Sequence, residues 1–222
     1  MRLLPTAKSA ATVVSDTRPI VFVVDDDLSV RESLEAWVGE AGWRSRLFVS
    51  AEDFLNDPGE RTPGCLVLDV SLPDLDGLEL QERIAEDRAY MPIIFITGRG
   101  DIPMSVQAMK AGAVEFLTKP VRPDVLVSAI RAAIERSRAV LAEQEELSNL
   151  RARHDALTPR ERDVMALVVR GRLNKEVAAE LGIKEFTVKH HRGSAMHKMK
   201  ARSLAELVRI AARLGLPTGG IR

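Results

Sequence analysis

Short apolar runs alternate with amphipathic stretches from residue 20 to about residue 137, and this alternation limits the possible folds more than any other feature. Each run has the length of a buried strand, and the stretches between them carry apolar residues at helical spacing. Strands that alternate with helices predict an α/β domain with a doubly wound, flavodoxin-like parallel sheet of five strands. The predicted strands are Ile20–Val24, Arg44–Phe48, Cys65–Leu68, Ile93–Thr97 and Ala113–Leu117.

The pattern changes at Thr158, where Thr158, Pro159 and Glu161 supply an N-cap, a proline at the first helical position and a capping glutamate. The stretch that follows carries helical patterns only. We therefore expect an all-α domain of four helices, at about 159–170, 174–181, 185–199 and 203–214.

A stretch without glycine or proline, Val125–Leu157, joins the two parts and predicts one long helix. Its apolar spacing is compatible with a short coiled coil, but Ser137, Gln144 and Ser148 interrupt the apolar seam. A solvated spacer and a dimerising helix both remain open. The expected organisation is a disordered tail without a signal peptide (1–18), the α/β domain (19–137), a helical linker (138–156) and the helical domain (157–222).

The formal net charge of zero conceals two halves of opposite sign. Residues 158–222 hold 14 Lys and Arg against six Asp and Glu, and the other residues hold 18 against 26. A small basic domain favours a polyanionic partner such as nucleic acid. The single cysteine, Cys65, excludes a disulfide framework and favours the cytoplasm, and the apolar runs are too short to span a membrane.

Carboxylates follow two of the predicted strands. Asp25, Asp26 and Asp27 come after the first strand, and Asp69 ends the third. Because these strands are neighbours in a doubly wound sheet, their side chains converge at the edge where such folds bind ligands. Crowded carboxylates repel each other, and oxygen ligands of this kind suit Mg²⁺. The sequence therefore predicts a magnesium site.

Two further strand ends complete the set. Thr97 ends the fourth strand with a hydroxyl, and Lys119 brings an amine after the fifth. Acids, a metal, a hydroxyl and a lysine suit a phosphoryl group held on a carboxylate. An aspartate triplet alone could merely cap the next helix. Four strand ends that carry these groups in order favour the phosphoryl site.

These residues resemble the signature of the response-regulator receiver family over residues 20–137. The matching motifs are Val23-Val24-Asp25-Asp26, Leu68-Asp69-Val70-Ser71-Leu72-Pro73-Asp74-Leu75-Asp76-Gly77, Ile96-Thr97-Gly98 and Thr118-Lys119-Pro120. The resemblance implies that Asp69 accepts the phosphoryl group. It implies that Asp26, Asp69 and the carbonyl of Ser71 bind Mg²⁺ directly, and that Asp25 does so through water. Thr97 and Lys119 would contact phosphoryl oxygens, Phe116 would be the switch aromatic, and the Lys119–Pro120 bond would be cis.

The helical part resembles the LuxR/NarL/FixJ DNA-binding domain from Leu157 to Ala211, and the receiver motifs are most similar to the FixJ subgroup. Residues 174–183 are typical of the scaffold helix and tight turn of a helix-turn-helix, and the next helix, the recognition helix, would enter the major groove. Lys184 replaces the usual capping Ser or Thr, which loosens the helix start by ~1 kcal/mol. The candidate DNA contacts are Thr187, Lys189, His190, Arg192 and Lys198.

The resulting hypothesis is a phosphorylation-controlled, DNA-binding transcription regulator in the cytoplasm. A sensor histidine kinase would phosphorylate Asp69, and a homodimer formed on phosphorylation would bind promoter DNA and activate transcription with RNA polymerase. Beyond its own phosphoryl transfer and dephosphorylation, the chain would not be an enzyme.

Two alternatives are weighed against this hypothesis. A dehalogenase-type phosphatase needs a second acid two residues after its nucleophile, where this chain has Ser71. A degenerate receiver that only dimerises is disfavoured by the complete set of Asp25, Asp26, Asp69, Thr97 and Lys119. Incorporation of phosphate would separate the latter from the main hypothesis.

Overall fold

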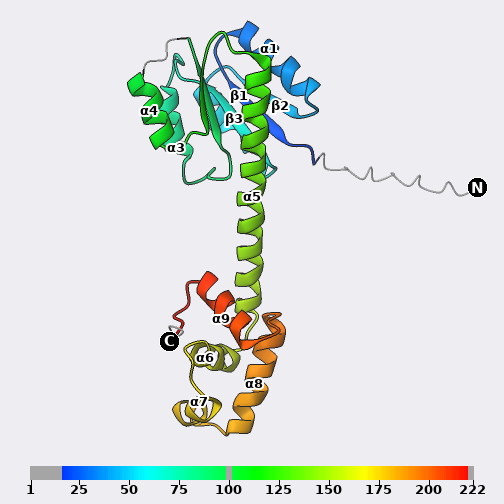
Figure 1. Cartoon of the computed structure of the whole chain (residues 1–222), viewed down its shortest axis with the longest axis vertical. Coiled ribbons are helices and arrows are strands. Elements are labelled where there is room, and N and C mark those ends of the chain that lie inside the picture. Colours follow the sequence, from blue (N-terminus) through cyan, green and yellow to red (C-terminus); the bar gives the residue numbers. More distant parts are fainter. Residues whose placement is uncertain (1–16, 99–101, 220–222) are drawn as a thin grey trace, which may run out of the picture. The chain divides into compact units, whose positions relative to one another are not determined.

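The alternating runs form one parallel sheet with the strand order β2-β1-β3-β4-β5, which confirms the doubly wound fold (Figure 1). The structure is a computed structural model that describes residues 17–98 and 102–219, so most of the predicted tail lies outside the described residues. The strands are β1 (Ile20–Val24), β2 (Arg44–Phe48), β3 (Gly64–Asp69), β4 (Ile93–Thr97) and β5 (Glu115–Thr118).

The start of β5 differs from the prediction, which began the strand at Ala113. The amide of Ala113 donates to the carbonyl of Ala108 at 3.1 Å, and so it closes the last turn of the preceding helix. The amide of Val114 donates to the carbonyl of Ile93 at 2.8 Å, and the strand itself begins at Glu115, which stands opposite Ile94. Ala113 therefore belongs to the end of the preceding helix, although its apolar side chain would suit a strand equally well.

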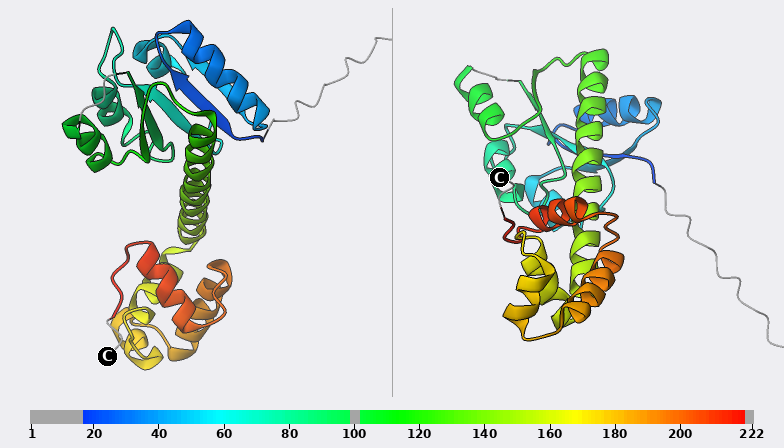
Figure 2. Two further views of the ribbon diagram at one scale, coloured as in Figure 1. Left: turned by 45° about the horizontal axis from the view of Figure 1, so that its top comes forward. Right: turned by 60° about the horizontal axis from the view of Figure 1, so that its bottom comes forward.

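Helices cover both faces of this sheet (Figures 1 and 2). One face packs Val21 and Val23 against α1 (Leu28–Glu40) and the first part of α5 (Pro123–Asp155). The other face packs Phe22 and Val24 against α2 (Ala51–Asn56), α3 (Gly77–Ile84) and α4 (Ile102–Lys110). The alternation of side chains along a strand explains why every residue of β1 is buried.

The chain divides into two compact units, Met1–Val140 and Leu141–Arg222. The second unit is helical, with α6 (Pro159–Val168), α7 (Asn174–Leu181), α8 (Glu185–Lys198) and α9 (Leu204–Arg213). These bounds agree with the four predicted helices to within two residues. The expected capping box is present, since the amide of Glu161 donates to Thr158 Oγ1 and the Glu161 carboxylate accepts from the Thr158 amide.

The predicted long helix is present as α5, Pro123–Asp155. Its C-terminal part belongs to the second unit, where Arg213 of α9 donates to Glu146 at 2.5 Å and Leu150 is buried. Gly182 ends α7 in the left-handed conformation, with φ of 63°, and thereby forms the tight turn before α8. Among the described residues, none of the helices combines the length and apolar character needed to cross a membrane.

Candidate functional site

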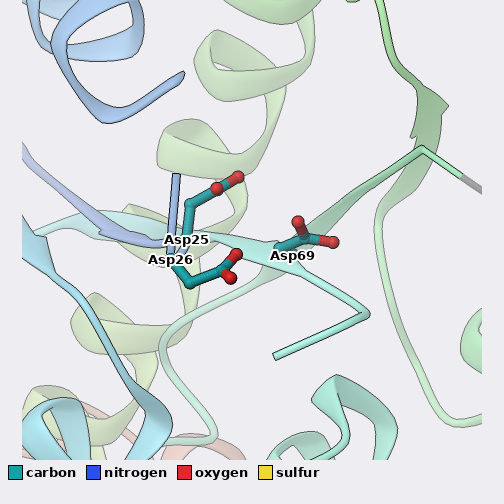
Figure 3. A group of neighbouring side chains, drawn as sticks. All are labelled: Asp25, Asp26 and Asp69. Carbon is teal, nitrogen blue, oxygen red and sulfur yellow. The ribbon is translucent and has the colours of Figure 1, made fainter. Parts of the chain in front are cut away.

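The predicted carboxylates meet at the adjoining ends of β1 and β3 (Figure 3). Val24 pairs with Leu68, so the residues that follow them, Asp25 and Asp69, end neighbouring strands. One carboxylate oxygen from each of Asp25, Asp26 and Asp69 lies within 4.8 Å of the others. Asp25 and Asp69 are buried, whereas Asp26 is exposed. The sheet register thus brings Asp69 to the adjacent pair Asp25 and Asp26, from which it is distant in the sequence.

Helix capping is assigned to the third member of the aspartate triplet. The side chain of Asp27 is the N-cap of α1, and it accepts from the Ser29 amide at 2.8 Å. The backbone amide of Asp27 in turn donates to Asp25 Oδ1 at 3.0 Å. Capping therefore explains Asp27 and leaves the carboxylates of Asp25 and Asp26 in the pocket.

Lys119 is the cation of this pocket. Its Nζ donates to Asp25 Oδ2 at 2.8 Å and to Asp69 Oδ2 at 2.6 Å. Burial raises the pKa of Asp25, although the hydrogen bond from Lys119 opposes this shift. Burial also disfavours charged Lys119, but its bonds to Asp25 and Asp69 outweigh burial and raise the lysine pKa. The Lys119 ammonium is thus held between the carboxylates of Asp25 and Asp69.

The remaining predicted residues lie in β4, in β5 and in the segment that follows β3. Thr97 is fully buried at the end of β4, and the Ser71 amide donates to Asp69 Oδ1 at 3.0 Å. Phe116 is half-buried in β5, with its ring centroid 6.2 Å from that of Phe95. The Lys119–Pro120 bond is cis, as the resemblance implied. The fold therefore brings Asp25, Asp26, Asp69 and Lys119 together, and the roles of Thr97 and Phe116 stay predictions.

The structure adds supporting residues that the sequence did not indicate. Arg31 is buried in α1, and its Nη1 donates to the carbonyl of Asp25 at 2.6 Å. Its place on the apolar stripe with Leu34 and Val38 was the available signal. Gly77 permits α3 to approach β3, because a Cβ there would lie 2.7 Å from the carbonyl oxygen of Asp69. Both residues fix the backbone of the pocket.

The donor set of the pocket fits a divalent cation. Three carboxylates and one ammonium leave an excess of negative charge, and every candidate ligand atom is an oxygen. Mg²⁺ binds hard oxygen ligands, and it commonly takes only a few of them from the protein and the rest from water. The acidic cluster is thus compatible with the predicted magnesium site.

The candidate DNA contacts lie on α8 but differ in their surroundings. Lys189 and His190 are exposed, and Thr187 is half-buried. Arg192 donates to Asn174 Oδ1 of α7 at 3.2 Å. Lys198 donates to Glu161 Oε2 of α6 at 2.6 Å, so its ammonium supports the start of α6. Lys189 and His190 are therefore the candidates whose side chains face solvent.

The start of α8 lacks a side-chain cap. Lys184 occupies the N-cap position, and its side chain makes no capping hydrogen bond with the described residues. Val188 is fully buried and packs with Val164 of α6 and Val177 of α7 in one apolar cluster. The recognition helix is thus anchored by packing and not by a polar cap.

A doubly wound sheet with this carboxylate–lysine pocket, joined to a helix-turn-helix unit, defines the class of response regulators with a DNA-binding output domain. Family models agree with this class. Residues 21–131 match the response regulator receiver domain, and residues 155–211 match the bacterial regulatory proteins of the luxR family. The chain belongs to the family of response regulators that combine a receiver with a LuxR-type DNA-binding domain.

Individual relatives cover both domains. The chain is 49% identical to nodulation protein W of Bradyrhizobium diazoefficiens over 91% of this chain and 89% of that protein. It is 42% identical to the transcriptional regulatory protein FixJ of Rhizobium meliloti over 86% of this chain and 94% of that protein. The solved structure of the response regulator StyR has a TM-score of 0.79 and 44% identity, and covers 88% of this chain and 99% of that one.

Proposed function

We propose that this chain is a phosphorylation-controlled transcription regulator in which a sensor histidine kinase phosphorylates Asp69. The observation that carries the proposal is the contact of Lys119 Nζ with both Asp69 and Asp25 at the end of β3. Asp69 ends β3 and contacts Lys119, and the adjoining strand β4 ends in the hydroxyl-bearing Thr97. These are the groups that hold a phosphoryl group on a carboxylate.

The chemistry follows from these groups. A carboxylate oxygen of Asp69 attacks the phosphorus of a phosphohistidine, the new O–P bond forms, and the P–N bond to the imidazole breaks. Lys119 and Thr97 contact the phosphoryl oxygens. Asp26, Asp69 and the carbonyl of Ser71 would hold Mg²⁺ directly and Asp25 would hold it through water, and the ion would supply positive charge against the negative charge of the transferred group. We assign no other catalytic activity to the chain.

A hollow beside the pocket suits the kinase. It has a volume of about 500 Å³ and shares Lys119 with the carboxylates. Trp37, Val30 and Leu34 of α1 line it together with residues that follow β5. An apolar helix face next to the acceptor gives a protein donor a place to dock, and we propose it as the kinase-facing surface. Because the kinase and promoter DNA meet the chain in the cytoplasm, we propose that it acts there.

Phosphorylation is proposed to act through the face of α4, β5 and α5. The exposed face of α4 carries Ile102, Val106 and Met109, which recur at helical spacing and are 79%, 45% and 45% exposed. Thr97 precedes α4, and Phe116 lies in the neighbouring strand. A phosphoryl group on Asp69 draws the Thr97 hydroxyl inward, and Phe116 turns into the space. This coupling changes the α4 face and favours a homodimer.

Dimerisation can be tested by sedimentation of the full chain with Mg²⁺ and a small phosphodonor. Val106→Asp places a charge on the proposed face and should leave the phosphorylated chain monomeric. Val49→Asp, which introduces the same charge at another exposed valine, should not. Dimerisation of both variants, with normal phosphate incorporation, would contradict the assignment of this face.

The proposed output is activation of transcription. In a homodimer, two copies of α8 would read half-sites about one helical turn apart, and the bound dimer would recruit RNA polymerase. The support is the basic charge of residues 158–222 and the exposed Lys189 and His190. Sequencing of transcripts with and without the gene would reveal the direction of regulation.

The test of the proposed function is incorporation of phosphate, measured as a mass shift after incubation with Mg²⁺ and a phosphodonor. The wild-type chain should gain one phosphoryl group, and Asp69→Asn should gain none. Asp87→Asn, at an exposed position, is the matched control. Phosphorylation of Asp69→Asn at the wild-type rate would overturn the assignment, and no phosphorylation of the wild-type chain would favour the degenerate receiver.

A further inference from the structure

Gly193 lies in the middle of α8, where the fold has no need of a glycine (orange in Figure 1). Its backbone is helical, and a Cβ at this position would have no heavy atom of the described residues within 4 Å outside its own helix backbone and chain neighbours. Glycine has the lowest helix propensity of all residues except proline. The unit therefore loses stability at Gly193 without gaining a contact or a turn.

The surroundings of Gly193 point to a ligand. A hollow of about 490 Å³ contains Gly193 and is lined by Lys189 and His190 one turn before it and by His197 and Lys198 one turn after it. The one acid of this lining, Glu161, is bonded to Lys198 at 2.6 Å. The opposite side of α8 carries the buried residues Val188 and Ala195. Gly193 thus stands at the centre of the outward, basic face.

We infer that Gly193 lets duplex DNA touch the backbone of α8 directly, in a recess between its basic neighbours. This inference rests on the proposed DNA binding by the second unit. Glycine permits the closest approach of a backbone to a ligand, and a Cβ would move the DNA away by up to about 1.5 Å. Charge interactions weaken with distance, so a contact between Lys189 and a phosphate would weaken too. Gly193 is therefore a specificity-determining position, at which glycine lowers the stability of α8 and allows DNA to approach its backbone closely.

The inference predicts opposite effects of a single methyl group. Gly193→Ala should raise the melting midpoint of the helix-turn-helix unit by about 4–8 °C, because alanine favours the helix. The same substitution should raise the Kd for duplex DNA about 5-fold or more, which is the smallest effect expected from losing one good base contact. Gly193→Gln should weaken binding further, because its longer side chain fills the recess.

Gly39→Ala is the matched control. Gly39 is also an exposed helical glycine whose Cβ would meet nothing within 4 Å among the described residues, but it lies in α1 of the receiver. Its substitution should stabilise the receiver and leave the Kd for DNA unchanged. A loss of affinity in Gly39→Ala equal to that in Gly193→Ala would overturn the inference.

The experiment uses the full chain, a fixed phosphodonor and Mg²⁺ concentration, and a duplex recovered by the wild-type chain from a random-sequence pool. Higher melting midpoint with weaker binding in Gly193→Ala supports the inference. Equal binding by Gly193→Ala and wild type overturns it while DNA binding stands. A lower melting midpoint with weaker binding also overturns it, because Gly193 would then serve the fold. Failure of the wild-type chain to retain any duplex overturns the proposed DNA binding, and the inference with it.

Discussion

The receiver and the helix-turn-helix unit hold their functional charges in opposite environments. In the receiver, Asp25 and Asp69 are buried and are held by Lys119 through bonds of 2.8 and 2.6 Å. In the second unit, Lys189 has 62% of its side chain exposed, and its ion pair with Glu185 spans 3.3 Å on the surface. Exposed pairs of this kind contribute little energy. The carboxylate–lysine pocket is therefore held by buried hydrogen bonds, whereas the cations of the proposed DNA-binding face are held only by weak contacts at the surface.

The largest expected effect follows from removing the buried cation. Lys119→Gln leaves Asp25 and Asp69 without their shared partner, and phosphate incorporation should slow by about 100-fold or more. Rates of mass shift in Mg²⁺ and phosphodonor would measure this. Arg122→Gln removes a nearby cation whose partner is the exposed Asp124, and it should have little effect. Equal rates in the two variants would show that the pocket is not organised around Lys119.

A smaller and sequence-dependent effect is expected on the exposed face. Lys189→Ala should weaken binding to the selected duplex by ~1–3 kcal/mol if Lys189 contacts a base. If Lys189 contacts a phosphate, binding to all duplexes should weaken alike. The slope of log K against the logarithm of the salt concentration should then become shallower by about 1. Titrations at several salt concentrations distinguish the two. No change on any duplex would remove Lys189 from the interface.

The second unit also contains a buried acid, Glu161, which is held in the same way as the acids of the receiver. Hydrogen bonds from Lys198 and from the Thr158 amide lower the pKa of Glu161 below its usual 4.5. Its stabilising contribution is therefore fully present above about pH 4.5 and is lost as the pH falls through the lower folded pKa. Glu161→Gln should cost ~1–3 kcal/mol at neutral pH and flatten the acid limb of the unfolding curve. An unchanged acid limb would mean that Glu161 does not titrate with folding.

The smallest effect is expected at the uncapped start of α8. Lys184→Ser supplies a side-chain oxygen to the free amides of the first turn and should stabilise the helix-turn-helix unit by ~1 kcal/mol. Thermal unfolding of the full chain would measure the gain, which should be confined to the second unit. Destabilisation would instead show that Lys184 makes a contact worth more than a cap.

The receiver site was predictable because its residues end strands. A short continuous apolar run locates each buried strand, and parallel strands bring Asp25, Asp69 and Thr97 to one edge of the sheet whatever the helices do. Arg31 was missed because its place on an apolar helix stripe indicates burial but does not indicate its partner, which is a backbone carbonyl. The start of β5 was misplaced because Ala113 suits both a strand and a helix end.

The DNA-binding face was less predictable because helix packing decides which side chains remain outside. Lys198 and Glu161 are 37 residues apart, and only the crossing of α8 with α6 brings them together at 2.6 Å. The sequence therefore predicted a DNA contact for Lys198 but gave no sign of its bond to Glu161. Lys189 and Lys198 look alike in the sequence but differ in what they touch.

The two units are joined functionally only if the buried site controls the exposed face. The direct test is the Kd of the full chain for the selected duplex, measured with Mg²⁺ before and after phosphorylation. We expect phosphorylation to tighten binding of the wild-type chain by about 5- to 150-fold, the usual range of coupling between two sites. Asp69→Asn should bind equally with and without the phosphodonor. Equal affinity of phosphorylated and unphosphorylated wild-type chain, with complete incorporation on Asp69, would contradict control of DNA binding by the receiver.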